Sequence, residues 1–391
     1  MSAPSHRRLA LVLGALAGIG PFSIDMYLPA LPALGASLGA SPGAVQGTLA
    51  IYFLGLACGQ VVYGPLADRY GRRGPLFAGL GLYTVAAVAC ALAPDIQALT
   101  VARLVQALGG CAGMVIARAV VRDVTDERGS VHLMAQIMLV MGVAPIVAPM
   151  VGGAVLPVFG WRGIFWLLAA YGATMFTVIA LFLPESLPLE RRRRGGVAEV
   201  AGVWRGLLGN RRFMGHALTG GFIIGGMFAY ISGSPFVFME LHGVSAGQFG
   251  FYFGANALGI MVTGQVVGRL AQRVAPARLL PVVLWVPLLS GLTLVFVTAT
   301  GIGGFATLLV ALFGYIAMIG AVMPLTTALG MGPHGAVAGS ASALMGTLQF
   351  GIGAGVGAIL GALQDGTAVP MAAVIAGCGL AGWTARRVLA R

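Results

Sequence analysis

Two oppositely charged residues stand inside long apolar segments. Asp25 interrupts the apolar run from 9 to 34, and Arg103 interrupts the run from 96 to 120. A charge inside such a segment is costly in a bilayer and usually faces a cavity or a partner. At ~1.5 Å of helix rise per residue, Asp25 lies roughly 13 Å from the C-terminal end of its segment, and Arg103 lies roughly 10 Å from the N-terminal end of its own. Both of these ends are expected on the same side of the membrane. The two charges are therefore expected to meet, either as a static ion pair or as a site where a proton and a cargo compete.

These charges need helices that cross a membrane to position them. The chain has 391 residues, of which 58% are apolar and 9% are charged. A soluble domain carries about 25% charged residues, so most of this surface must face lipid. The 62 glycines agree, because small residues allow transmembrane helices to pack closely. The predicted fold class is an all-α polytopic membrane protein.

Apolar runs long enough to cross a bilayer divide the chain into twelve predicted spans. Their limits are 9–34, 43–65, 75–93, 96–120, 131–158, 161–183, 212–240, 245–271, 277–299, 302–329, 335–362 and 367–388. All 23 basic residues are arginines, and all but Arg103 and Arg162 fall on one side of the membrane if both termini are cytoplasmic. Cytoplasmic loops are enriched in Arg and Lys, so this orientation is the predicted one.

A repeated segment divides the spans into two halves. Gly59-Gln60-Val61-Val62, at the end of the second span, recurs as Gly264-Gln265-Val266-Val267 at the end of the eighth. Two related helical bundles around a central cavity are a transporter architecture. We therefore predict an N-terminal bundle over 1–187, a cytoplasmic linker over 188–210 and a C-terminal bundle over 211–391.

Three motifs resemble those of the major facilitator superfamily. Gly64-Pro65-Leu66-Ala67-Asp68-Arg69-Tyr70-Gly71-Arg72-Arg73 is similar to the superfamily's G-x-L-x-D-R-x-G-R-[RK] loop between spans two and three. Arg103-Leu104-Val105-Gln106 resembles its R-x-x-Q-G motif, and the segment from Pro145 through Pro149 to Gly152-Gly153 resembles its antiporter motif. Ala107 and Ala148 stand where the superfamily usually has glycine.

Further segments resemble the Bcr/CflA drug-resistance transporters of that superfamily. They are Asp25-Met26-Tyr27-Leu28-Pro29, Pro235-Phe236-Val237, Asn256, Ala338-Gly339-Ser340 and Gln349-Phe350-Gly351. The resemblance covers nearly the whole chain. It implies the major facilitator fold, with 12 transmembrane helices in two pseudo-symmetric six-helix bundles, and drug:proton antiport.

The resemblance also implies a conformational latch at the loop after span two. Its expected members are Gly64, Asp68, Arg69, Gly71, Arg72, Arg73, Arg118, Arg122 and Asp123. Asp68 is expected to interact across the two halves, and the loop arginines with acids such as Asp123. The simpler alternative is a basic loop that only sets the topology.

Two further groups of residues concern motion and cargo. Pro145, Pro149, Gly152 and Gly153 predict a hinge or a close helix interface in span five, because proline kinks a helix and glycine permits close packing. A cargo cavity combines apolar walls with a few polar groups. The candidate lining residues are Asp25, Tyr27, Tyr52, Arg103, Gln106, Met114, Phe228, Tyr230, Asn256, Tyr315, Gln349 and Phe350. Packing against other helices is the alternative for each aromatic or methionine among them.

The expected function is proton-driven export of small, fairly apolar drugs, such as chloramphenicol-, florfenicol- or bicyclomycin-like compounds. Asp25 takes a proton when the cavity opens outward and loses it when the cavity opens inward, and Arg103 holds the ionised form. The alternatives are export of a small metabolite, such as an amino acid or short peptide, and a non-transporting receptor or scaffold.

The sequence contains no Walker loop, H-E-x-x-H motif or credible Ser/His/Asp grouping, so neither an ATP-driven pump nor an enzyme is expected. We expect no cofactor, metal or nucleic acid. The expected setting is a monomer in a bacterial inner membrane, with protons and small molecules as partners.

Overall fold

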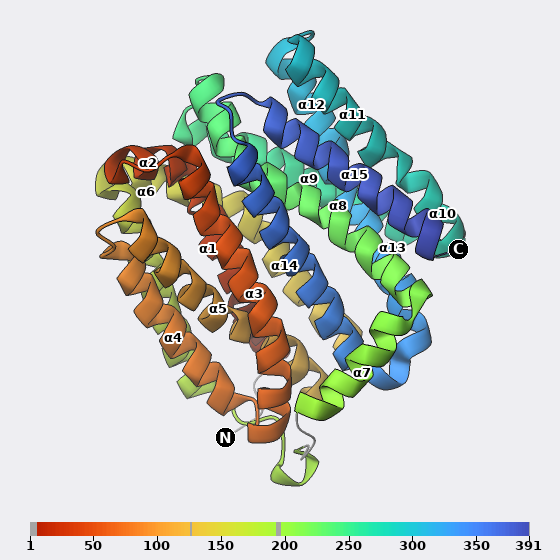
Figure 1. The fold of residues 1–391 in the computed structure, drawn as a ribbon. Helices are drawn as coiled ribbons and strands as arrows, with labels where there is room; N and C mark the ends of the chain where they lie inside the picture. Colours follow the sequence, from red (N-terminus) through yellow and green to blue (C-terminus); the bar gives the residue numbers. More distant parts are fainter. Residues whose placement is uncertain (1–5, 126, 193–196, 391) are drawn as a thin grey trace.

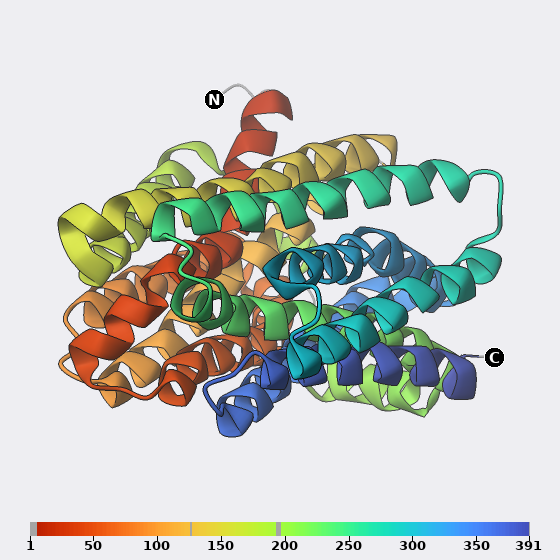
Figure 2. The same ribbon diagram turned by 90° about the horizontal axis from the view of Figure 1, so that it is seen from above.

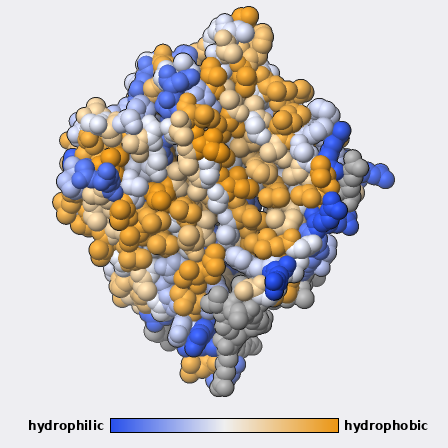
Figure 3. Space-filling model, viewed as in Figure 1, coloured by the Kyte–Doolittle hydropathy of each residue, from blue (hydrophilic) through white to orange (hydrophobic). Residues whose placement is uncertain are grey.

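The computed structural model describes residues 6–125, 127–192 and 197–390, and these residues form helices without any strand. Figure 1 shows the helices of the first half on one side of the molecule and those of the second half on the other. Apolar side chains cover the middle of the visible face, while hydrophilic ones gather toward its edges (Figure 3). This surface suits helices that pass through lipid.

The first half is built from long, nearly all-apolar helices. They are α1 (His6–Asp25), η1 (Leu28–Ala30), α2 (Leu31–Leu38), α3 (Pro42–Tyr70), α4 (Arg73–Ala91), α5 (Ile96–Val124) and α6 (Glu127–Phe182). The backbone of α6 leaves helical geometry at Gly160 (φ 64°), where the chain turns back. The apolar part of α6, Met141–Phe182, has 42 residues, about twice what one crossing needs. It therefore supplies two passes, as the predicted spans 131–158 and 161–183 require.

The second half repeats this plan after a connecting segment. Its elements are α8 (Arg211–Pro235), the π-helical η3 (Phe236–Leu241), α9 (Ala246–Leu270), α10 (Pro276–Val283), α11 (Trp285–Thr300), α12 (Gly304–Ala317), α13 (Ile319–Met331), η4 (Gly332–Val337), α14 (Ala338–Leu363) and α15 (Val369–Leu389). In the described chain, nine helical stretches are long and apolar enough to cross a membrane. With the double pass of α6 and with α9 and α15, the predicted twelve passes are present.

The first predicted span is shorter than expected. The apolar run continues to Leu34, but α1 ends at Asp25, and η1 and α2 follow as separate short helices. Pro29 and Pro32 stand in this run and cannot donate a backbone hydrogen bond to a continuing helix. Asp25 therefore lies at a helix C-terminus instead of in a helix interior.

The connecting segment contains helix α7 (Val197–Gly209). Leu207 is buried against Phe213 and Leu344 of the second half. The indole Nε1 of Trp204 donates a hydrogen bond to the Ser340 carbonyl at 3.1 Å. Part of the predicted polar linker is thus an amphipathic helix docked on the beginning of α14.

Two helix pairs join the halves. α3 packs along α14, and α6 packs along α9 (Figure 2). The end of the molecule that holds η1, α2 and η3 is predicted to face outward, and we call it the outer end. There η1 contacts α8 and α9, and α2 contacts η3, so the halves touch at the outer end.

Candidate functional site

Asp25 is buried between the two halves without a positive partner. Its exposed fraction is 4%, and no ion pair reaches it among the residues that the structure describes. The expected Asp25–Arg103 ion pair is therefore absent from this structure. The physical reason is the early end of α1, which offers Arg103 a different acceptor.

Arg103 caps the C-terminal end of α1. Its Nη1 donates to the Ser23 carbonyl at 3.2 Å and to Gln106 Oε1 at 2.8 Å. The last carbonyls of a helix lack intrahelical partners and carry the negative end of the helix dipole, so a cation is favourable there. The Arg103 side chain is fully buried, and its Nε and Nη2 make no hydrogen bond within the described residues.

Aromatic rings surround the Arg103 guanidinium. Its Cζ lies 4.0 Å from the centroid of Tyr52, 4.8 Å from Tyr27 and 5.8 Å from Phe165. Ring faces attract a cation electrostatically, which partly replaces the missing carboxylate. Four predicted residues, Tyr27, Tyr52, Arg103 and Gln106, are thus brought together in the first half, together with Phe165, which no sequence motif indicated.

Asp25 is within electrostatic range of the second half, where its carboxyl group interacts with the Tyr230 hydroxyl on α8. That hydroxyl accepts a hydrogen bond from Asn256 Nδ2 on α9 at 3.0 Å. Tyr230 and Asn256 are 1% and 6% exposed. We call Asp25, Tyr230 and Asn256 the interhalf triad. The sequence singled out each of these residues but did not predict that they meet.

An aromatic cluster also bridges the halves. Phe53 of α3 and Phe228 of α8 have ring centroids 4.2 Å apart, and Phe228 stacks on Phe350 of α14 at 5.8 Å. The predicted Phe228 and Phe350 thus lie at the interface, together with Phe53, which the sequence analysis did not select. Gln349 is half-buried beside Phe350 on α14.

Two predicted lining residues have packing roles. Tyr315 is fully buried inside the second half, where its hydroxyl donates to the Ile223 carbonyl at 3.3 Å. Its ring also fills the space beside Gly226, so its assignment to the cargo cavity is wrong in this structure. Met114 is half-buried and packs on Gly20 of α1.

A charged network surrounds the loop between α3 and α4. Arg72 Nη1 lies 2.6 Å from Asp68 Oδ1, and Arg72 Nε lies 2.7 Å from Asp123 Oδ2. The Ser186 hydroxyl donates to Asp123 at 3.0 Å. Glu185 accepts from the backbone N–H groups of Arg72 at 2.8 Å and Arg73 at 3.1 Å. We call Asp68, Arg72, Asp123, Glu185 and Ser186 the loop network.

The loop network joins helices of one half. Asp68, expected to act across the halves, pairs with Arg72 of its own loop. The predicted contact between the loop arginines and Asp123 is present. Glu185 and Ser186 follow α6 and were not selected from the sequence, although Glu185 stands near the beginning of its longest polar stretch.

Gly71 is required by the geometry of this loop. Its φ of +89° lies in the region that side chains disfavour. A Cβ atom there would lie 2.6 Å from Glu185 Oε2 and 2.7 Å from Arg192 Nη2. Only glycine therefore allows Glu185 to close over the loop.

The remaining expected latch residues lie around the network. Arg73 donates to the Ala180 carbonyl at 3.2 Å, and Arg69 is exposed beside the Tyr70 ring. Arg118 donates to the Met114 carbonyl and to Gln60. Gly64 lies within α3. The Arg122 side chain falls outside the part that the structure describes.

The glycines of span five pack helices closely. A Cβ atom on Gly152 would collide with the Met26 carbonyl, and one on Gly153 would lie 2.7 Å from the Ala246 carbonyl at the beginning of α9. Pro145 and Pro149 lie within the same helix, α6. This arrangement is the predicted close interface, and the predicted hinge motion remains a prediction.

Acid should weaken the loop network through Glu185. Burial raises the pKa of Glu185, but hydrogen bonds from the backbone N–H groups of Arg72, Leu187 and Arg73, and the nearby Arg192 charge, lower it below its ordinary value on balance. A carboxyl whose pKa is lowered by folding stabilises the fold above its unfolded pKa, ~4.3 for glutamate, and this stabilisation is lost as the pH falls through the folded pKa.

Glu185→Gln is therefore expected to lose less thermal stability than the unchanged protein as the pH falls from about 6 to below ~4.3. The measurement is the thermal unfolding midpoint of the purified protein in detergent. Glu190→Gln, in the same segment, is the matched control. An unchanged pH profile in Glu185→Gln would contradict this role.

Comparisons with known proteins agree with the fold. The model of the Major Facilitator Superfamily matches residues 13–358. The chain is 41% identical over 370 residues to an uncharacterized MFS-type transporter, YdgK, of Bacillus subtilis, covering 94% of this chain and 91% of that protein. It is 28% identical to a bicyclomycin resistance protein homolog of Haemophilus influenzae, covering 94% and 92%. It is also 28% identical to the multidrug resistance protein MdtL of Escherichia fergusonii, covering 86% and 83%.

Solved structures show the same fold at lower identity. A bacterial homolog of the human lysosomal transporter Spinster, in an inward-facing and unoccupied conformation, has a TM-score of 0.74 at 17% identity and covers 100% of this chain and 98% of that one. A D-xylose-proton symporter has a TM-score of 0.73 at 14% identity, covering 96% and 97%. With the twelve passes, these matches show that the chain belongs to the major facilitator superfamily, a family of transporters.

Proposed function

We propose that this transporter exports small, fairly apolar drugs in exchange for protons. The observation that carries the proposal is the position of Asp25. It is a buried carboxyl group with no ion pair among the described residues, placed where the two halves meet. An ionisable residue inside a membrane protein marks a proton or cargo pathway when no permanent counter-ion holds it.

The interhalf triad connects the protonation of Asp25 to the relative position of the halves. Asp25 belongs to the first half, while Tyr230 and Asn256 belong to the second. A change of charge at Asp25 therefore alters an interaction between the halves, and a movement of the halves alters the surroundings of Asp25. Alternating access requires such a link between occupancy and conformation.

The interface between the halves supports an apolar cargo. Phe53, Phe228 and Phe350 bring aromatic rings together from both halves. Drug-like molecules bind in apolar, aromatic sites with a few placed polar groups. The names of two relatives, a bicyclomycin resistance protein homolog and a multidrug resistance protein, support the same class of cargo.

The proposal includes the setting of the transporter. It acts as a monomer in the bacterial inner membrane with both termini cytoplasmic, and the proton gradient replaces any cofactor. The arginine distribution supports this orientation.

Proteoliposomes with an imposed pH gradient test the function. Chloramphenicol, bicyclomycin and a panel of amino acids and dipeptides are the cargoes. Movement of a drug against its own gradient, driven by the pH gradient and abolished by a protonophore, is the expected result. Gradient-driven movement of the amino acids or dipeptides alone would favour the metabolite exporter, and no movement of any cargo would contradict the proposal.

A further inference from the structure

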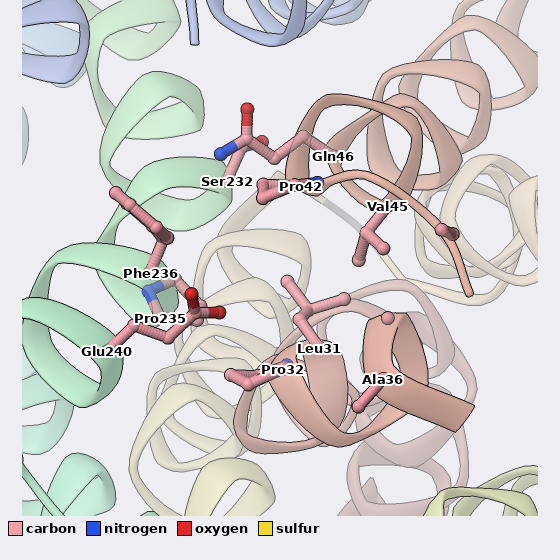
Figure 4. Close-up of a pocket in the computed structure, with 12 residues that line it drawn as sticks. Leu31, Pro32, Ala36, Pro42, Val45, Gln46, Ser232, Pro235, Phe236 and Glu240 are labelled. Carbon is pink, nitrogen blue, oxygen red and sulfur yellow. The ribbon is translucent and has the colours of Figure 1, made fainter. Parts of the chain in front are cut away.

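A cavity lies at the outer end, between the two halves, and its lining does not include the interhalf triad. Its volume is about 300 Å³. It is lined by α2 and the beginning of α3 on one side and by α8 and η3 on the other (Figure 4). The lining residues that matter for its chemistry are Leu31, Val45, Gln46, Ser232, Phe236 and Glu240.

Three polar groups with acceptor oxygens line this cavity. Gln46 is 3% exposed and Ser232 is 1% exposed, and neither Gln46 Oε1 nor Ser232 Oγ has a hydrogen-bond partner in the described structure. Figure 4 shows the Gln46 side chain reaching toward α8 and the Glu240 carboxylate directed toward Leu31. Buried polar atoms normally have partners, so two such atoms on facing helices are suited to a donor that enters the cavity.

The charge of the lining indicates that the donor group of the ligand is positively charged. Glu240 is exposed and supplies the only formal charge among the described residues that line the cavity. The walls are otherwise apolar, formed by Leu31, Val45, Phe236 and several prolines. A carboxylate and two acceptors attract an ammonium group, which carries up to three N–H donors.

From this arrangement we propose that the outer cavity binds a small organic amine with a compact apolar body. The ammonium group lies among Gln46, Ser232 and Glu240, and the apolar body contacts Leu31, Val45 and Phe236. A cavity of this size lies at the lower end of the range for small-molecule sites.

Binding at this site stabilises one conformation. Leu31, Val45 and Gln46 belong to the first half, whereas Ser232, Phe236 and Glu240 belong to the second. The site is complete only when the halves touch at the outer end, so its ligand shifts the population toward that state. Binding of the amine does not depend on the proposed transport function. Only an inhibition of transport by the bound amine rests on that function.

Binding of three probes that share one apolar body, adamantane, to the purified protein in detergent tests the proposal. The probes are 1-adamantylamine, neutral 1-adamantanol and adamantane-1-carboxylate, measured by titration calorimetry. The amine is expected to bind more tightly than the alcohol, and the carboxylate more weakly than either. Glu240→Gln should weaken amine binding about fivefold, as expected for an exposed charge pair, and leave alcohol binding unchanged.

A further variant locates the bound amine. Asp365→Asn removes another exposed acid, between α14 and α15, and should leave binding unchanged. Equal binding of amine and alcohol, no effect of Glu240→Gln, or loss of amine binding in Asp365→Asn would each overturn the proposal, whatever the transport assay shows.

Discussion

Asp25→Asn is expected to abolish proton-driven export while leaving the protein folded. Asparagine has nearly the same volume as aspartate, so the buried space between the halves stays filled. The amide cannot gain or lose a proton, and the interhalf triad then keeps one charge state in every conformation. We expect gradient-driven drug transport in proteoliposomes to fall at least about a hundredfold, the scale on which an essential proton-transfer group acts.

Drug movement down its own concentration gradient separates loss of coupling from loss of folding. In Asp25→Asn this downhill movement should persist and should no longer move protons, as measured with a pH-sensitive dye inside the vesicles. Asp365→Asn, which changes an exposed acid in the same way, should retain drug movement and proton movement together. Proton movement that still accompanies the drug in Asp25→Asn would contradict the role of this carboxyl group.

The sequence predicted the passes of the chain well because lipid imposes a simple rule on each of them. Every pass needs a long apolar helix, and the arginines mark the loops. The end of α1 at Asp25 was missed, since the apolar run continues through Pro29 and Pro32 as short helices. Hydropathy averages over a window and does not register such a break inside an apolar run.

The partners of the charged residues were harder to predict. Depth along a helix placed Asp25 and Arg103 at a similar level, but depth does not tell which side of a helix a residue faces. In the structure Arg103 contacts the end of α1 and the Tyr52 ring, whereas Asp25 interacts electrostatically with Tyr230 in the other half. The proposed proton coupling therefore involves residues of both halves.

The loop network, too, could be predicted from the sequence only in part. Its motif was recognisable, and the contact between Arg72 and Asp123 was predicted from their position at the same end of the bundle. Glu185 and Ser186 are more than a hundred residues from the loop in sequence and belong to no motif. Only the packing of α4 against the end of α6 brings them to Arg72.

Arg72→Leu is expected to be the most destabilising change in the loop network. The Arg72 side chain is 7% exposed and holds Asp123, whose side chain is 14% exposed. Removing one member of a buried ion pair leaves the other charge uncompensated, at a cost of about 3–5 kcal/mol. We therefore expect a lower thermal unfolding midpoint of the purified protein and slower transport by the fraction that remains folded.

Arg69→Leu is the matched control, because Arg69 lies in the same loop but is exposed beside Tyr70. Its effect on the unfolding midpoint should be small, since exposed charges contribute little to stability. The double variant Arg72→Leu/Asp123→Leu removes both charges of the buried pair and should recover part of the lost stability. Equal unfolding midpoints for Arg72→Leu and Arg69→Leu would mean that the basic loop only sets the topology. The double variant is expected to be more stable than Arg72→Leu only if Arg72 pairs with Asp123. A loop that acts through its positive charge alone would gain no stability from the loss of Asp123.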